Sequence, residues 1–370
     1  MKRSIEVFMV FALVNSVVPS AILRAEAPQA AQDPIEIRSF ELGDFPLESG
    51  KVLAAAKLAY TTRGTLNAAK SNAILLPSPY SGDHTSHDFL IGPGKAIDPA
   101  VHFIIATNQL GNGFSSSPSN TPGSQKGADF PAIAIRDDVE ATYRLVTRKL
   151  GIERLLAVVG FSMGGQQAMQ WAVSHPDSIR GVVNLCGSAR EYPFGIVRLE
   201  GAKGAIMGDP TWAGGRYTEP PVGGLRALGL HWVAWAYSPQ WWRDGEYKAR
   251  GGTVEKQVEG WKSAFLSEDA NNLILQAVKW QKHDVGTTPG MNDDFAKALG
   301  SIKAKILLMP SRSDQYFLAA DVEAEGRLIP GSRLFVIPST FGHTAGGGGD
   351  PAMNPTLNQT IKEFLASLGD

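Results

Sequence analysis

A hydrophobic run that ends in a glycine-flanked serine constrains this fold most. Residues 155–159 are rich in Val and Leu and predict a buried strand, and the sequence GFSMGG at 160–165 leads directly into a predicted helix at 163–174. So sharp a strand-to-helix turn forces strained backbone angles on Ser162, and a side chain at Gly160 or Gly164 would collide with the neighbouring strand or helix. The pattern predicts a nucleophile elbow that lifts the Ser162 hydroxyl above a sheet.

The rest of the chain alternates short strands with helices. Strands are predicted at 35–42, 52–60, 73–76, 101–106, 155–159, 181–185, 305–309 and 333–337. Helices are predicted at 137–150, 163–174, 319–328 and 356–368. Asp137 is the expected N-cap of the first helix, with Glu140 completing a capping box. This alternation predicts an α/β fold with a mostly parallel sheet and helices on both faces.

A long helical segment interrupts the alternation. Residues 188–299 contain no expected strand but hold seven of the eight tryptophans. We interpret them as a mainly helical cap inserted between the sixth and seventh strands, with 35–187 and 300–370 forming the α/β core. The tryptophans either form a small core within the cap or line a pocket for an apolar substrate.

The first residues have the order of a secretory signal. Lys2 and Arg3 precede an apolar run at 7–23, and small residues follow at 25–27. We therefore predict a cleaved signal peptide at 1–27, a linker at 28–34, and a periplasmic or secreted mature protein without a stable membrane anchor.

Composition excludes several classes of partner and site. Thirty-five basic residues against 36 acidic ones leave no field that would attract nucleic acid. One cysteine, Cys186, excludes an intrachain disulfide and any site that needs several cysteines, and we expect it to be a small core residue. No cofactor and no metal ion are expected.

A serine nucleophile needs an imidazole base and a carboxylate that orients the base. In proteins with this elbow the chain order is serine, acid, histidine. Of the seven histidines, only His343 follows a late predicted strand in a glycine-flanked loop. Asp314 occupies the corresponding loop after 305–309, whereas the rival Asp321 falls on a helix surface, where a carboxylate is usually solvated. We predict Ser162, Asp314 and His343 as a catalytic triad.

An oxyanion hole needs two backbone amides near the nucleophile. Met163 follows the serine and supplies one amide. Tyr80, in the loop after the third strand, is our choice for the second, with Ser81 as the alternative because Pro79 has no N–H.

Two further patterns could indicate ligand binding. His84 and His87 could form a metal pair, but the sequence offers no third ligand beside them. The glycines at 346–349 lack the Lys-Ser/Thr of a phosphate-binding loop, so we expect a flexible rim beside His343.

Several motifs together resemble the homoserine O-acetyltransferase family of α/β-hydrolase-fold proteins. They are GADFPAIAIRDD at 127–138, GFSMGGQQAMQWA at 160–172, DPTW at 209–212, GGRY at 214–217 and the Gly342-His343 pair. The resemblance extends from about residue 36 to the end of the chain. It implies an α/β-hydrolase fold, the triad of Ser162, Asp314 and His343, the oxyanion hole of Tyr80 and Met163, and a homodimer formed through the cap.

Two departures from the family pattern bear on the substrate. Homoserine-acylating members carry an acidic residue directly after the catalytic histidine, where this chain has Thr344, and an arginine in the cap that binds the substrate carboxylate. After Gly224-Leu225 this chain has Arg226-Ala227, so that arginine is missing or moved. An amino-acid substrate would leave charges uncompensated, and an exported enzyme would not meet acetyl-CoA.

These departures favour water as the acyl acceptor. We therefore predict an exported serine hydrolase that cleaves small-molecule carboxylic esters through an acyl-enzyme. The alternatives are an O-acyltransferase of the homoserine type that uses acetyl-CoA, and a non-catalytic binding protein that keeps the fold.

Overall fold

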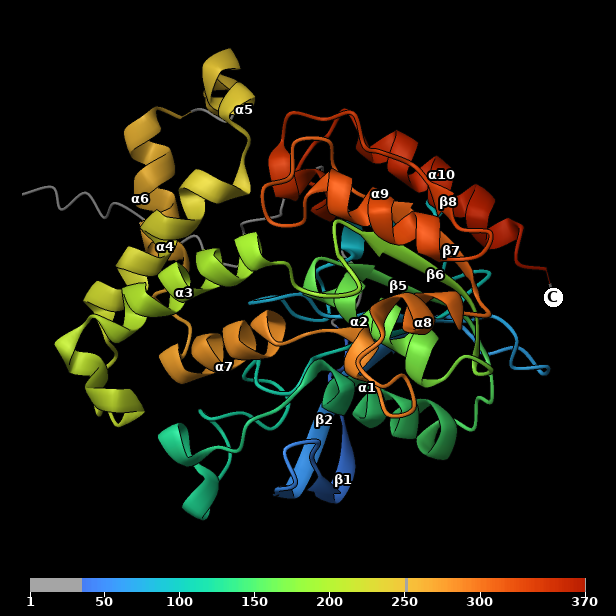
Figure 1. The fold of residues 1–370 in the computed structure, drawn as a ribbon, viewed down its shortest axis with the longest axis horizontal. Coiled ribbons are helices and arrows are strands. Elements are labelled where there is room, and N and C mark those ends of the chain that lie inside the picture. Colours follow the sequence, from blue (N-terminus) through green and yellow to red (C-terminus); the bar gives the residue numbers. More distant parts are fainter. Residues whose placement is uncertain (1–34, 250–251, 370) are drawn as a thin grey trace, which may run out of the picture.

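An eight-stranded sheet forms the centre of the protein (Figure 1). The computed structural model describes residues 35–249 and 252–369, so the predicted signal peptide at 1–27 and linker at 28–34 lie outside the described residues. The strands are β1 (Arg38–Pro46), β2 (Val52–Arg63), β3 (Ala73–Pro77), β4 (Phe103–Thr107), β5 (Leu155–Phe161), β6 (Ile179–Leu185), β7 (Lys305–Met309) and β8 (Arg333–Leu334). Their order across the sheet is β1-β2-β4-β3-β5-β6-β7-β8.

Most of the sheet is parallel, as predicted. Strand β1 pairs antiparallel with β2, and β2 pairs antiparallel with β4. The neighbours from β4 to β8 are all parallel. The last strand is shorter than predicted, because β8 ends at Leu334 and Ile337 forms only an isolated bridge to Ser311. The carboxyl ends of the parallel strands therefore meet at one edge, where β5 leads into Ser162.

Helices cover both faces of the sheet, which confirms the predicted layers. The helices are α1 (Ile135–Arg144), α2 (Met163–Ser174), α3 (Pro193–Met207), α4 (Val222–Ala236), α5 (Pro239–Asp244), α6 (Val254–Ala264), α7 (Ala270–Gln281), α8 (Phe295–Gly300), α9 (Ala319–Leu328) and α10 (Asn354–Ala366). Residues of α1, α2, α8 and α9 share one hydrophobic cluster with Val158, whereas α10 packs on the opposite face with Ala157 and Val159. Alternate residues of β5 thus contribute to two separate cores.

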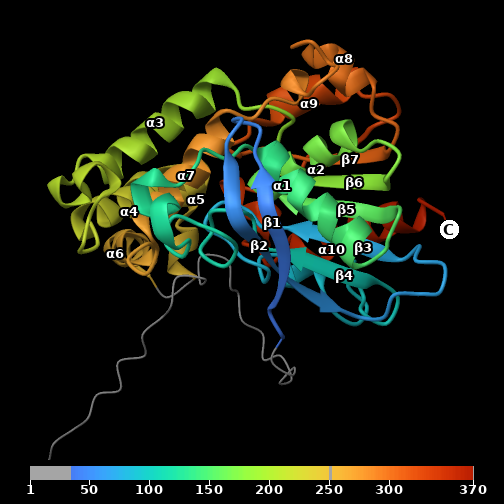
Figure 2. The same cartoon turned by 90° about the horizontal axis from the view of Figure 1, so that it is seen from below.

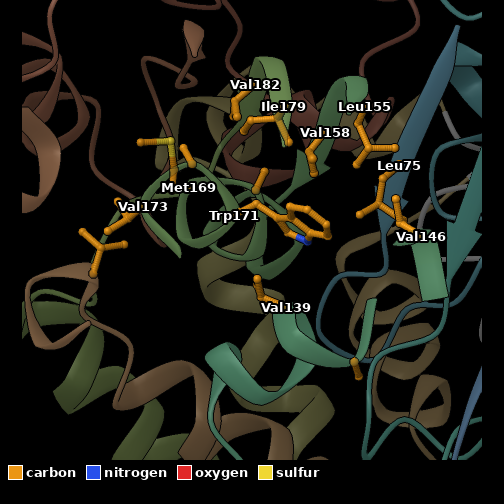
Figure 3. Packing of buried hydrophobic residues seen from close by; sticks show 14 of the residues in the cluster. Leu75, Val139, Val146, Leu155, Val158, Met169, Trp171, Val173, Ile179 and Val182 are labelled. Atoms are coloured by element: carbon orange, nitrogen blue, oxygen red, sulfur yellow. The ribbon is translucent and has the colours of Figure 1, made fainter. Parts of the chain in front are cut away.

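Trp171 anchors helix α2 in the larger cluster (Figure 3). Its side chain is buried, and its Nε1 donates a hydrogen bond to Thr142 Oγ1 of α1 at 3.0 Å. A buried indole with a satisfied N–H combines a large hydrophobic contribution with a directional contact. Because α2 begins directly after Ser162, this packing fixes the position of the serine.

The start of α1 differs from the sequence prediction. The helix begins at Ile135, so the predicted N-cap at Asp137 is wrong. Asp137 is instead the third helical residue, and its carboxylate accepts from the amides of Ala134 at 2.7 Å and Glu48 at 2.8 Å. A carboxylate at the third helical position can accept a hydrogen bond from the backbone amide of the N-cap residue, here Ala134, so Asp137 still satisfies a free amide at the start of the helix.

Helices α3–α7 gather at one end of the sheet (Figure 2) and form the helical insertion between β6 and β7. They share a third hydrophobic cluster, which includes Trp232, Trp241 and Trp280. A buried ion pair of 2.6 Å between Lys279 of α7 and Asp138 of α1 joins the insertion to the core. Within residues 35–249 and 252–369, no helix is long and apolar enough to cross a membrane.

Candidate active site

The turn after β5 has the geometry that its glycines predict. Ser162 has φ 58° and ψ −125° and lies between β5 and α2. A Cβ at Gly160 would stand 2.0 Å from the carbonyl oxygen of Gly164, and a Cβ at Gly164 would stand 2.4 Å from that of Pro77. Both positions therefore exclude any side chain, and this close packing holds the Ser162 backbone in its strained conformation.

Three residues that are far apart in the sequence form one hydrogen-bonded chain. The Ser162 Oγ lies 2.9 Å from Nε2 of His343, and Nδ1 of His343 lies 2.8 Å from Oδ2 of Asp314. All three residues are buried, so the contacts are shielded from water. The structure thus brings together the serine, base and acid expected from the sequence, in an order that can pass a proton from Ser162 to His343.

The acid and the base are each held in place by their surroundings. The Oδ1 atom of Asp314 accepts from the amides of Tyr316 at 2.7 Å and Phe317 at 3.3 Å, which leaves Oδ2 for the imidazole. The ring of Tyr316 stacks on that of His343 with centroids 4.3 Å apart. The rotamers of Asp314 and His343 are therefore fixed before a substrate arrives.

The loop after β3 distinguishes the two candidates for the second oxyanion donor. The Ser81 amide donates to Gln276 Oε1 at 3.0 Å, so it is already engaged. Among the described residues, no acceptor engages the amide of Tyr80 or that of Met163. This leaves Tyr80 and Met163 as the pair of amides that can receive a developing negative charge.

The histidine pair near this loop has structural contacts instead of metal-binding geometry. Nε2 of His87 accepts the Phe161 amide at 3.2 Å, and burial lowers the His87 pKa to about 4. His84 lies against Asn108. The part of the chain that the structure describes contains no group of three side chains able to hold a metal ion.

The expected flexible rim beside His343 is wrong. The glycines at 346–349 are buried, and a Cβ at Gly346 would stand 2.4 Å from Sγ of Cys186. Cys186 is buried directly after β6, as expected of a core residue. At Gly346, Gly348 and Gly349, close packing around the His343 loop therefore leaves no room for a side chain.

A buried polar cluster beside the triad escaped the sequence analysis. Arg198 of α3 lies 3.8 Å from Glu191 in an ion pair whose side chains are almost fully buried. Glu191 Oε2 accepts from Nε1 of Trp280 at 2.5 Å and from Nε2 of Gln166 at 3.4 Å. No local pattern marks these residues, because they come together only when α3 and α7 fold onto α2.

The tryptophans of the insertion divide between the two expected roles. Trp232 and Trp280 contact Tyr80 and Tyr316 beside the triad. Trp241 stacks on Tyr237 within the insertion, with ring centroids 3.9 Å apart. Trp232 and Trp280 therefore border the candidate site, and Trp241 lies deeper in the insertion within the same hydrophobic cluster.

The two positions that depart from the homoserine-acylating pattern offer no charged group to the site. Thr344 is buried, and its hydroxyl donates to the carbonyl oxygen of Phe341 at 2.7 Å. Arg226 forms an ion pair with Glu259 of α6, and both side chains are partly exposed. Arg226 therefore does not replace the carboxylate-binding arginine of that pattern.

The chain is similar to known esterases and to homoserine O-acetyltransferases. A family model described as alpha/beta hydrolase fold matches residues 81–217. An ethyl acetate hydrolase of Pseudomonas veronii is 40% identical over 90% of this chain and 96% of its own length. A homoserine O-acetyltransferase of Nostoc punctiforme is 32% identical over 87% of this chain and 94% of its own.

A solved structure extends the likeness to three dimensions. An acetylester hydrolase from Corynebacterium glutamicum has 37% sequence identity and a TM-score of 0.87, and the match covers 90% of this chain and 96% of that one. The chain therefore belongs to the α/β-hydrolase-fold family that includes these esterases and the homoserine O-acetyltransferases.

Proposed function

We propose that this protein is a serine hydrolase that cleaves small-molecule carboxylic esters through an acyl-enzyme. The observation that carries the proposal is the hydrogen-bonded chain from Ser162 through His343 to Asp314. The similarity to an ethyl acetate hydrolase and an acetylester hydrolase supports acetyl esters as substrates.

The first half of the reaction forms the acyl-enzyme. His343 Nε2 takes the proton of Ser162 as Oγ attacks the ester carbonyl, and Asp314 stabilises the imidazolium through Nδ1–H. The amides of Tyr80 and Met163 hold the negative oxygen of the tetrahedral intermediate. The alcohol then leaves with the proton that His343 returns.

Water completes the cycle. His343 removes a proton from a water molecule as it attacks the acyl carbonyl, and the same two amides hold the second oxyanion. When this intermediate collapses, the Ser162 oxygen regains its proton from His343 and the carboxylic acid is released. Each step uses protein groups already in place, with no large rearrangement of the triad.

Acyl transfer to homoserine is the competing function, because a homoserine O-acetyltransferase is 32% identical. Thr344 and the surface pairing of Arg226 support hydrolysis instead, since neither offers a charged partner to an amino-acid acceptor. Wild-type enzyme is assayed with ethyl acetate, and separately with acetyl-CoA with and without homoserine. We expect acetate release from ethyl acetate; rapid CoA release that depends on homoserine would contradict the proposal.

We also infer that the protein is exported and works in the periplasm or outside the cell. The support is the order of Lys2, Arg3, the apolar run at 7–23 and the small residues at 25–27. Cell fractionation and N-terminal sequencing test this inference. A mature chain beginning near residue 28 outside the cytoplasm is expected, and an unprocessed cytoplasmic chain would contradict it.

A homodimer through the insertion is a further part of the proposal. Phe194 and Val197 of α3 and Val222 and Leu230 of α4 are apolar side chains at least 48% exposed. Contiguous exposed apolar patches mark interaction surfaces, and we infer that these four side chains on the adjacent helices α3 and α4 form such a patch. Light scattering coupled to size-exclusion chromatography is expected to give twice the chain mass, and Val197→Glu to give the monomer mass; a monomeric wild type would contradict the dimer.

A further inference from the structure

The guanidinium group of Arg198 is buried without a hydrogen bond. The side chain is 1% exposed, and within the described residues Nε, Nη1 and Nη2 all lack a hydrogen-bond partner. Glu191 Oε1 lies 3.8 Å from Nη2, which is an ionic contact but too long for a hydrogen bond. A buried charged donor without an acceptor is costly, so such a group calls for a missing partner.

Arg198 lies one aromatic ring away from the catalytic imidazole. Its Cζ is 4.3 Å from the ring centre of Tyr316, and this ring stacks on His343 with centroids 4.3 Å apart. Its Cζ also lies 4.8 Å from the ring centre of Trp280 and 5.3 Å from that of Trp232. Both indoles also contact the ring of Tyr80 in the oxyanion loop. The guanidinium, which has no hydrogen bond, therefore lies directly behind the aromatic rings that border the reacting groups.

Glu191 does not fully neutralise this charge. Burial raises the Glu191 pKa to about 8, and the charges of Asp314 and Asp321 also raise it. The positive charge of Arg198 and the hydrogen bond from Trp280 lower this pKa, but by less than burial raises it. Burial therefore weakens the negative charge that Glu191 offers to Arg198. Glu191 also lines a small pocket with Tyr192, Phe194 and Asp321. Arg198 thus keeps a positive charge that an anion could match.

We propose that Arg198 binds a carboxylate group of the substrate, so that the enzyme favours esters that carry a second, ionised carboxyl group. This inference rests on the proposed ester hydrolysis at Ser162. The planar guanidinium presents two parallel N–H groups that fit a carboxylate, and the surrounding aromatic rings exclude competing water. The same pairing would supply the hydrogen-bond acceptors that Arg198 lacks in the free protein.

Two pairs of matched esters test the proposal. Monoethyl succinate is compared with ethyl levulinate for a carboxylate on the acyl side, and 3-acetoxypropionate with 4-acetoxybutan-2-one for the alcohol side. In each pair a methyl ketone replaces the carboxylate at nearly equal size. The measured quantity is the ratio of kcat/KM for the charged ester to kcat/KM for the neutral one, at pH 7.

Arg198→Met is expected to lower this ratio at least tenfold in one pair, mainly by raising KM for the charged ester. The responding pair identifies the side of the ester that carries the carboxylate. Arg226→Met is the matched control, because it removes a cap arginine that pairs with Glu259 at the surface, and its ratio should match that of wild type. An unchanged ratio in both pairs, or an equal loss for both members of a pair, would overturn the carboxylate site.

A binding measurement separates failure of this inference from failure of the proposed function. Succinate is titrated calorimetrically into Ser162→Ala and into the Ser162→Ala, Arg198→Met double variant, after thermal unfolding confirms that both are folded. At least tenfold weaker binding of succinate to the double variant supports the site. Equal binding to the two variants, or no binding to either of them, contradicts it. If ethyl acetate and all four esters resist the wild-type enzyme, ester hydrolysis is wrong, and this titration alone decides the role of Arg198.

Discussion

The carbonyl oxygen of Pro77 lies 2.4 Å from the position that a Cβ atom on Gly164 would occupy. The end of β3 and the first turn of α2 are therefore in direct backbone contact beside the nucleophile. Gly164→Ala must separate these two elements, and we expect destabilisation of about 1–3 kcal/mol, as for other overpacked sites, together with a marked loss of kcat. Thermal unfolding and ester hydrolysis measure the two effects.

Gly260→Ala is the matched control for this prediction. Gly260 lies in α6 and is exposed, and a Cβ there would meet no atom within 4 Å. Alanine favours helix by up to about 1 kcal/mol, so this variant should be as stable as wild type or more so. Equal stability and activity for Gly164→Ala and Gly260→Ala would contradict the proposed packing constraint.

Asp314 is expected to orient His343 and to stabilise it when charged. Asp314→Asn removes that charge and can hold the imidazole in the wrong tautomer, so kcat should fall by roughly 10³–10⁴-fold with little change in fold. Asp321→Asn on α9 is the control, and its kcat should stay within about threefold of wild type. Steady-state kinetics with p-nitrophenyl acetate provide the measurement. If Asp321→Asn lost more kcat than Asp314→Asn, the catalytic acid would be Asp321 and not Asp314.

Glu325 should make the protein less stable as pH rises. Burial raises its pKa from 4.5 to about 8, so between these values the folded chain holds a proton that the unfolded chain has released. Stability therefore falls with rising pH across this window. Glu325→Gln can still accept the Ala189 amide and contact the Tyr192 hydroxyl, and should flatten the decline.

Melting temperatures between pH 5 and pH 8.5 test this effect. Glu323→Gln is the control, because Glu323 lies on the same helix but is only half-buried. The slope of Tm against pH should become shallower for Glu325→Gln and stay the same for Glu323→Gln. Parallel curves for wild type and Glu325→Gln would contradict the role given to Glu325.

The sequence predicted the features that depend on local geometry and chain order. The glycines around Ser162 encode a turn whose steric demands are local, so the elbow and its flanking elements could be located. The α/β alternation indicated the sheet, and the positions of Asp314 and His343 after late strands placed both residues at the same edge as Ser162. Their catalytic roles are part of the proposal.

Long-range contacts set the limit of these predictions. The choice between Tyr80 and Ser81 depends on Gln276, which lies 195 positions further along the chain and accepts a hydrogen bond from the Ser81 amide. Arg198 and Glu191 carry no sequence signal, because their burial depends on how the inserted helices settle on the core. The glycines at 346–349 suggest flexibility by composition, but their neighbours in space bury them.

The central claim is that Ser162 is the nucleophile of an ester hydrolase. The most direct measurement is the rate of ethyl acetate hydrolysis by the wild-type protein and by Ser162→Ala, with thermal unfolding confirming that both are folded. We predict that wild type releases acetate and that Ser162→Ala loses essentially all activity. Activity of Ser162→Ala within tenfold of wild type would contradict the account.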